Sequence, residues 1–149
     1  MPITYRLPYP PTVNHYWKDA IFGKGPGARR GRIRTPKAKA YCEAVVAVVW
    51  AEGFPPQLTL TGPLRVEVIY RPPDRRKRDL DNLQKGLLDA LGQSQVFVDD
   101  NQIWDFRAHW DLNDAGQVIV EPGGSAVVSI WPLETGAELF AKHEKWRES

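Results

Sequence analysis

Short segments in which apolar and polar residues alternate predict the β-strands of this chain. The clearest alternation runs from Leu64 to Arg71. Because successive side chains of a strand point to opposite faces, its even-numbered residues would form one buried face. Further strands are predicted at Ile3–Leu7, Ile103–Trp110, Gln117–Val120 and Ala126–Trp131. In the second of these, Trp104, Phe106, Ala108 and Trp110 would share a face.

Apolar residues recur at helical spacing in two longer segments. The first helix would follow Thr35 as N-cap, with Pro36 at its first position, and end at Gly53. The second would run over Asp81–Leu91 and be closed by Gly92. A weaker helical pattern covers 136–146. Strands mixed with two or three helices in one domain predict an α+β fold with a small mixed sheet.

Glycine and arginine dominate residues 23–32, within a basic stretch that covers about 18–39. Such a composition cannot pack a core, so it predicts a mobile loop that only a ligand orders. The 149 residues suit one domain, expected over 1–131, with an extension of unknown role at 132–149.

Composition narrows the class of protein. Hydrophobic residues make up 42% and charged residues 26%, which is typical of a globular chain. The longest apolar run, Ala44–Ala51, is too short to cross a bilayer, and no apolar segment marks a secretory signal. Cys42 is the single cysteine, which excludes an intrachain disulfide and a cysteine zinc site. We therefore expect a cytoplasmic protein without a membrane partner.

Charge is distributed unevenly along the chain. The formal net charge is only +2, but 13 of the 20 basic residues lie in Lys18–Lys39 and Arg71–Arg78. Clustered cations are typical of proteins that bind a phosphate backbone, because each neutralised phosphate releases counterions. A solvated basic face is the alternative explanation.

Candidate chemistry follows the second basic cluster. Asp79 and Asp81 are two residues apart, so in extended backbone both carboxylates project to the same side. Lys85 lies one helical turn after Asp81, and the pair Asp99–Asp100 follows a short apolar run. Convergent carboxylates without His or Cys form the oxygen-only site that Mg²⁺ prefers. Beside cations that hold a phosphodiester, such a site suits metal-assisted hydrolysis, with Lys85 stabilising or protonating the reacting phosphate.

Structural roles for the same residues stay open at this point. Asp81 would cap a helix, Asp79 would pair with an arginine, and Asp99–Asp100 would form a turn. An Asp-x-Asp pair also occurs in enzymes that hold a metal-bound nucleotide sugar. A DNA-binding protein without catalytic activity and a metal-dependent enzyme acting on nucleotides are therefore the rival functions.

The run Asp74–Lys85, then Leu88–Leu91, then Val98–Ile103, closely resembles the RusA family of Holliday-junction resolvases. Looser similarity lies in Leu7–Asn14 and around Arg34–Thr35. The resemblance implies a small α+β fold, a homodimer, and Mg²⁺-dependent paired nicking of four-way DNA junctions in recombination and repair, with Mn²⁺ as a substitute ion and no small-molecule cofactor.

The resemblance also implies roles for individual residues. The metal ligands would be Asp79, Asp81 and Asp100, and Lys85 would complete the catalytic set. The expected DNA contacts are Asn14, His15, Arg30, Arg32, Arg34, Arg75, Arg76, Lys77, Arg78 and Asn82.

Several further residues carry more modest expectations. Asp89 and Asp99 are candidates for residues that support the metal ligands without binding the ion. The default role of Asp89 is an ion pair with Lys85, four residues earlier on the helix. His15, Tyr16 and Trp17 either stack on unpaired bases or, for the two larger rings, pack in the core. Trp50, Trp104, Trp110 and Trp131 are expected in the core or in a dimer interface. The candidate interfaces are the apolar faces of the strands around Val66 and Trp104 and the helix that ends near Trp50.

Overall fold

A computed structural model describes residues 2–53 and 59–133 of the chain. Its main sheet has four strands in the order β1–β6–β4–β5. These strands are β1 (Ile3–Leu7), β4 (Leu64–Arg71), β5 (Ile103–Trp110) and β6 (Ser125–Pro132). Strand β6 runs antiparallel to β1 and β4, whereas β4 and β5 are parallel. The predicted α+β fold with a small mixed sheet is confirmed.

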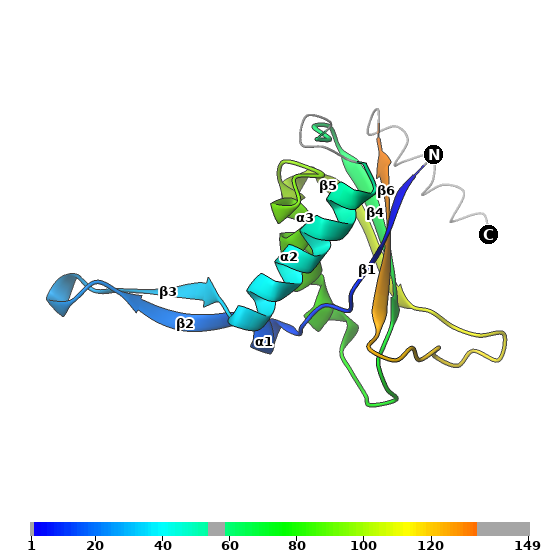
Figure 1. The fold of residues 1–149 in the computed structure, drawn as a ribbon, viewed down its shortest axis with the longest axis horizontal. Helices are drawn as coiled ribbons and strands as arrows, with labels where there is room; N and C mark the ends of the chain where they lie inside the picture. Colours follow the sequence, from blue (N-terminus) through cyan, green and yellow to red (C-terminus); the bar gives the residue numbers. More distant parts are fainter. Residues whose placement is uncertain (1, 54–58, 134–149) are drawn as a thin grey trace.

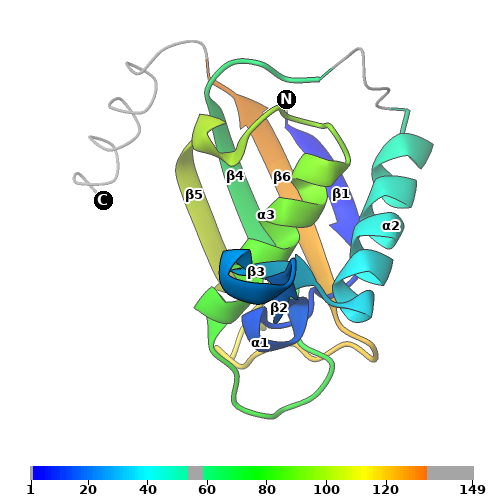
Figure 2. The ribbon, with the colours of Figure 1, turned by 90° about the vertical axis from the view of Figure 1, so that its left-hand side faces the viewer.

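Two helices, α2 (Pro36–Ala51) and α3 (Gln84–Gln93), cover one face of this sheet (Figure 2). A parallel strand pair needs a long crossover, and α3 lies in the connection from β4 to β5. Shorter helical turns are α1 (Val13–Tyr16), η1 (Gly25–Gly27), η3 (Leu80–Leu83) and η4 (Asp100–Gln102). Within the described ranges, no helix has the length and apolar character needed to cross a membrane.

The core forms where the predicted apolar faces meet. The alternation in β4 is confirmed, since Leu64, Val66, Val68 and Tyr70 are each at most 1% exposed. Leu83, Leu87 and Leu91 pack against them from the α3 side. The N-cap of α2 is also confirmed, because the Thr35 hydroxyl accepts a hydrogen bond from the backbone N–H of Ala38 at 3.1 Å. Burial of Val66 inside the chain makes the prediction of an interface around it wrong.

A register shift changes which residues of β5 face the core. Leu64 pairs with Ile103, but Arg65 pairs with Asp105, so Trp104 has no partner in the ladder. Ile103, Phe106, Ala108 and Trp110 pack on the core, whereas Trp104 is 54% exposed. The predicted shared face is therefore wrong for Trp104, because simple alternation does not register a bulge.

The glycine- and arginine-rich stretch is a β-hairpin, so the prediction of a loop without regular structure is wrong. Strands β2 (Trp17–Phe22) and β3 (Arg29–Arg34) pair antiparallel over their full length. They project from the body as an arm (Figure 1). The positive φ angles of Gly23 and Gly25 allow the chain to reverse at its tip. Arginine side chains line the strands without interrupting the backbone ladder.

Two further predicted elements have different outcomes. Residues 117–120 form a single bridge, Leu112 to Val118, in place of a strand. The turn before them explains this difference, because the Asn113 side-chain oxygen binds the backbone N–H groups of Ala115 and Gln117 and curls the segment. The predicted helix at 136–146 lies outside the described residues.

Gly86 lies where α3 meets the ring of Tyr16, and this close approach yields a prediction. A Cβ added at Gly86 would lie 2.9 Å from Tyr16 Cδ2 and 3.3 Å from the Pro11 carbonyl oxygen. Tyr16 is fully buried, so its ring has little room to move. We expect Gly86→Ala to lower the free energy of unfolding by about 1–3 kcal/mol, despite the better helix propensity of alanine.

Gly92 on the same helix is the matched control. Its added Cβ would meet only Phe97 Cε2, at 4.0 Å. Gly92→Ala should therefore leave stability unchanged or raise it by about 0.5 kcal/mol. Urea unfolding of both variants measures the contrast, and equal effects at the two positions would contradict the packing explanation.

Candidate functional site

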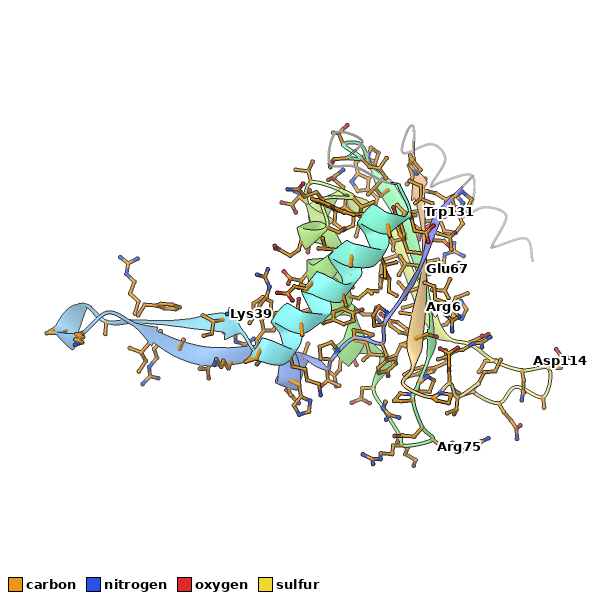
Figure 3. The ribbon with its side chains drawn as sticks, viewed as in Figure 1. Arg6, Lys39, Glu67, Arg75, Asp114 and Trp131 are labelled. Atoms are coloured by element: carbon orange, nitrogen blue, oxygen red, sulfur yellow. The ribbon has the colours of Figure 1, made fainter. Side chains whose placement is uncertain are left out.

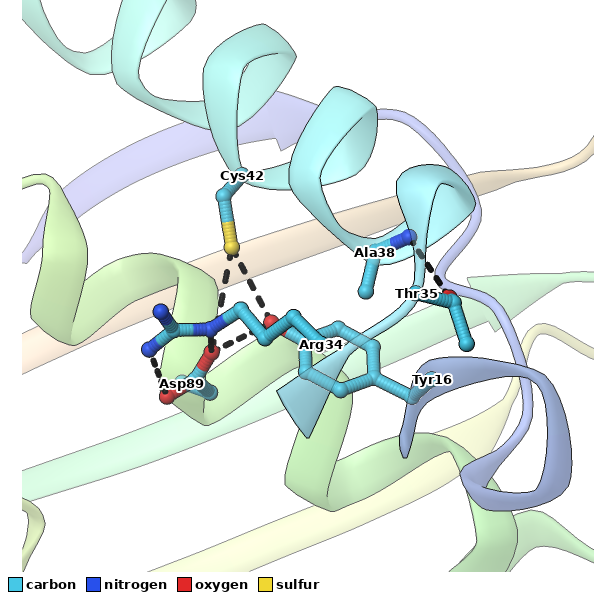
Figure 4. A network of polar contacts seen from close by, with 6 residues as sticks. All are labelled: Tyr16, Arg34, Thr35, Ala38, Cys42 and Asp89. Carbon is cyan, nitrogen blue, oxygen red and sulfur yellow. Dashed lines mark hydrogen bonds and ion pairs between the residues drawn. The ribbon is translucent and has the colours of Figure 1, made fainter. Parts of the chain in front are cut away.

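The carboxylate of Asp89 connects three elements around the base of the arm (Figure 4). Arg34, the last residue of β3, donates from Nε to Asp89 Oδ2 at 2.7 Å and from Nη2 to Oδ1 at 2.9 Å. The Tyr16 hydroxyl donates to the same Oδ2, and the Cys42 thiol on α2 lies 3.0 Å from that hydroxyl. Asp89 therefore fixes the arm and α2 against α3.

One sequence-based expectation is wrong at this point. Asp89 pairs with Arg34 and not with Lys85, because its carboxylate faces inward while Lys85 is exposed. The expected DNA contact of Arg34 stays a prediction; its guanidinium holds a bidentate ion pair, and its side chain is 30% exposed. Tyr16 is buried and hydrogen-bonded, which confirms the core position that was its alternative to base stacking.

Electrostatics around Asp89 agree with this arrangement. Burial raises the pKa of its carboxyl, but the hydrogen bonds from Arg34 and Tyr16 outweigh burial and hold it below the usual 3.8. The same hydrogen bond raises the pKa of Arg34, while burial and the Asp89 hydrogen bond raise that of Tyr16. Asp89 is therefore a carboxylate at neutral pH, stabilised by an always-charged partner.

Asp99 and Asp100 meet at the start of η4. The Asp99 side chain accepts a hydrogen bond from the backbone N–H of Asn101 at 3.0 Å, and Gln102 completes a capping box. Interaction with the neighbouring Asp99 carboxyl raises the pKa of Asp100. The hydrogen bond from the backbone N–H of Asn101, followed by the interaction with Asp100, lowers the pKa of Asp99. Asp99 thus has the turn-forming role that was one of its two expected roles. Both carboxyls line a hollow of about 230 Å³ with Asp89.

The other predicted metal and catalytic residues lie at the start of the α3 segment. Asp79 precedes η3, Asp81 and Asn82 lie in it, and Lys85 is in the first turn of α3. Asp79, Asp81 and Lys85 are exposed. The structure does not place Asp79 in the hollow that holds Asp100, and the described residues contain no group of three His, Cys, Asp or Glu positioned for a metal ion. The proposed ligand set stays a prediction.

Asp74 organises the basic loop that precedes Asp79. Its Oδ1 accepts from the backbone N–H of Arg76 at 2.9 Å and lies 2.7 Å from Nη1 of Arg78. Arg78 also donates to the carbonyl oxygens of Asp74 and Arg76. These contacts lower the pKa of Asp74 to about 2. The Arg78 side chain is 19% exposed and holds the loop in shape, and its expected DNA contact stays a prediction.

The remaining cations of this loop face solvent. Arg76 keeps 84% of its side chain exposed, and Arg75 lies at the outer end of the loop (Figure 3). Neither Arg75 nor Lys77 has an ion-pair partner in the part of the chain that is described. The loop borders an open hollow of about 540 Å³ whose lining runs from Pro72 through the cations to Asp79. Free positive charge is therefore adjacent to a candidate metal ligand.

The N-terminal candidates occupy two places. Arg30 and Arg32 lie on one face of the arm, opposite Ile21 and Asp19. Asn14 and His15 are exposed on α1, and the His15 ring bonds the Thr12 hydroxyl at 3.0 Å. His15 shares a hollow of about 470 Å³ with Arg78.

Sequence reasoning missed the structural importance of Tyr16, Cys42 and Asp74. Their partners lie on other elements or depend on a folded loop, so no local spacing marks them. Only for Asp74, four residues before Arg78, did the sequence contain a usable signal.

Comparison with known proteins gives consistent results. Residues 8–121 match the family model described as Endodeoxyribonuclease RusA. A crossover junction endodeoxyribonuclease of Enterobacteria phage 82 is 34% identical over 102 residues, which make up 68% of this chain and 76% of that protein. The crossover junction endodeoxyribonuclease of Escherichia coli K12 is 33% identical over 102 residues, which again cover 68% of this chain and 76% of that protein. The crossover junction endodeoxyribonuclease of phage HK97 is 33% identical over 131 residues, which cover 87% of this chain and 93% of that protein.

The Asp89 network yields a test of stability. Asp89→Asn should lower the free energy of unfolding by about 2 kcal/mol at neutral pH, because hydrogen bonds to charged groups contribute roughly 1.5–3 kcal/mol. Arg34→Met removes the same ion pair, so the two losses should not add in the double variant. Urea unfolding of the single and double variants measures both effects.

The same pair gives a pH dependence. Because the folded pKa of Asp89 is below 3.8, its contribution is fully present above the unfolded pKa and is lost as the pH falls through the folded value. The stability difference between wild type and Asp89→Asn should therefore shrink as the pH falls below 3.8. Asp114→Asn, at an exposed loop tip (Figure 3), is the control that should show no such change. A pH-independent difference would sink the ion-pair explanation.

Proposed function

The chain belongs to the RusA family of endodeoxyribonucleases, and from this we propose that it resolves Holliday junctions by paired symmetric nicks in DNA recombination and repair. The observation that supports this activity best is the hollow in which exposed cations lead directly to Asp79. Cations bind the phosphate backbone, and a neighbouring carboxylate site can deliver hydrolysis to it.

We propose Mg²⁺ as the cofactor, held by Asp79, Asp81 and Asp100. The donor chemistry fits, because all three are exposed carboxylates, and carboxylate oxygens are ligands that Mg²⁺ prefers. Bound Mg²⁺, or Mn²⁺ in its place, neutralises charge on the phosphate and lowers the pKa of water. Exposed side chains reorient at little cost, so phosphate and cation together would gather ligands that stand apart in the structure.

The chain's own residues then have distinct tasks. Lys85, exposed one turn before Asp89, would place its ammonium group at the reacting phosphate and protonate the leaving oxygen. Arg75, Arg76 and Lys77 would hold the backbone on one side of the scissile bond. Arg30 and Arg32 on the arm, with Asn14, His15 and Asn82, would contact the remainder of the DNA.

We propose a homodimer as the active form. Two nicks on opposed strands need two equivalent sites, and this chain carries one copy of the Asp79–Lys85 segment. A two-fold dimer is the simplest arrangement that supplies the second site. Trp50 and Trp104, which are 50% and 54% exposed, are candidates for the subunit contact among the exposed large apolar residues.

Single substitutions separate catalysis from binding. Asp79→Asn, Asp81→Asn and Asp100→Asn should each abolish nicking of a labelled four-way junction, while junction affinity holds or rises because negative charge is removed. Lys85→Ala should reduce the nicking rate by about 10²–10⁴-fold. Asp114→Asn should nick like wild type.

These assays also discriminate the rival functions. A non-catalytic DNA-binding protein would bind junctions with and without Mg²⁺ and never nick them. An enzyme acting on nucleotides would show turnover without affinity for DNA. Full activity of any one Asp→Asn variant would remove that residue from the site.

The exposed cations of the basic loop have a separate signature. Neutralising Arg75, Arg76 and Lys77 to glutamine should flatten the dependence of log affinity on log salt by about 0.9 for each lost phosphate contact. Arg107→Gln, on the sheet's outer edge, is the control. An unchanged slope would place the loop away from the DNA backbone.

Subunit mixing tests the dimer. Wild type should sediment as a dimer at micromolar concentration, and mixed dimers of wild-type and Asp81→Asn chains should nick only one of the two opposed strands. A monomer that makes paired nicks in one binding event would contradict the symmetric mechanism.

A further inference from the structure

Two large apolar side chains are exposed at the far end of the arm. Ile21 is 69% exposed and Phe22 is 50% exposed, at the end of β2 that lies away from the body (Figure 1). Neither contributes to the core. Exposed apolar groups on a projecting element are typical of a contact surface.

The Phe22 ring has a specific position. It lies over Gly31 of the neighbouring strand, where an added Cβ would be 2.8 Å from Phe22 Cε2 and 3.3 Å from Cδ2. One face of the ring therefore rests on glycine backbone. The half-exposed ring leaves a flat aromatic surface towards solvent.

Cations surround this apolar tip. In the hairpin register Arg29 is opposite Phe22 and Arg30 is opposite Ile21, and Lys24 lies in the turn. The one acidic residue of the described arm, Asp19, is opposite Arg32, whose Nε lies 3.9 Å from its carboxylate. Because successive side chains alternate, Arg29 lies on the face of Phe22 and Arg30 lies on the other face beside Ile21. Neither arginine has an ion-pair partner among the described residues. A flat aromatic surface with a cation on each face of the same tip suits nucleic acid, whose bases stack while its phosphates accept the charges.

The base of the arm holds the tip in place. Arg34, the last residue of β3, forms an ion pair with Asp89. The Thr35 hydroxyl donates to the His15 carbonyl oxygen at 2.6 Å, beside the start of β2. Both strands are thus anchored where they leave the body. An arm ordered before binding presents its tip without a large loss of conformational entropy.

We propose that this tip, formed by Ile21, Phe22, Arg29 and Arg30, is a wedge that occupies the branch point of a DNA junction. The Phe22 ring stacks on a base that lacks a stacking neighbour, and the two arginines bind the flanking phosphates. This inference rests on the proposed function and adds a reader of branched structure. A linear duplex offers the ring no open base, so the contact selects junctions.

Matched substitutions at two positions test the wedge. Phe22→Leu keeps apolar bulk but removes the flat ring, so it should weaken binding to an immobile four-way junction at least about fivefold. Phe22→Trp should retain affinity. Gly31→Ala should mimic Phe22→Leu, because its methyl group displaces the ring while Phe22 stays present. None of these three substitutions should change the affinity for a linear duplex of the same sequence. Leu112→Ala is the control at another exposed apolar residue (55% exposed), and it should leave the affinity for junction and duplex unchanged.

A fluorescent base reports on stacking itself. 2-Aminopurine at the branch point should change its fluorescence when wild type binds in the absence of divalent ions, and Phe22→Leu should lose that change. Equal weakening on duplex and junction, or an unchanged branch signal in Phe22→Leu, would overturn the wedge. Loss of the dimer in Phe22→Leu would instead make the tip a subunit contact and would overturn it too.

The readout is independent of nicking. A wild-type protein that perturbs branch bases but never nicks with Mg²⁺ would refute the proposed activity and support the wedge. If the Phe22→Leu variant nicks junctions at the wild-type rate and binds them with unchanged affinity, the proposed activity is supported and the wedge is refuted.

Discussion

The inward-facing carboxylate of Asp89 is the contact on which the arrangement of this molecule depends. It binds the guanidinium that ends β3 and the hydroxyl that precedes β2, and it lies beside a thiol of α2. All of these donors converge on a carboxyl only 22% exposed. Removing Arg34 leaves a partly buried carboxylate without its charged partner, which is why such networks fix geometry more strongly than a surface ion pair does.

Local pattern was sufficient for the layers of the fold. Period-two alternation in β4 and the Thr35–Pro36 start of α2 are consequences of backbone geometry, and both are confirmed. The arm was missed because arginine side chains say little about backbone pairing. The face of Trp104 was missed because an unpaired residue between Ile103 and Asp105 interrupts the alternation there, while Phe106, Ala108 and Trp110 keep their predicted shared face.

The chemistry of the Asp79–Lys85 segment stays a prediction, whereas the structure tests the contacts of individual side chains. The basic cluster and the spacing of its carboxylates predict phosphodiester chemistry, but ion-pair partners are set by tertiary structure. Asp89 illustrates this limit. Helical spacing pointed to Lys85, whereas a buried position favoured Arg34, whose planar guanidinium satisfies both carboxylate oxygens at once.

The basic residues of this chain therefore fall into two groups, those held in ion pairs within the fold and those exposed to solvent, which a count of basic residues does not distinguish. Arg34 and Arg78 are at most 30% exposed and hold the arm and the loop through Asp89 and Asp74. Arg75, Arg76 and Lys77 are exposed. Each anchored arginine stabilises the element that presents the exposed ones, so loss of Arg34 or Arg78 would disturb that element. The division follows from physics, because a guanidinium already held by a carboxylate gains little from a phosphate and would leave a partly buried anion behind.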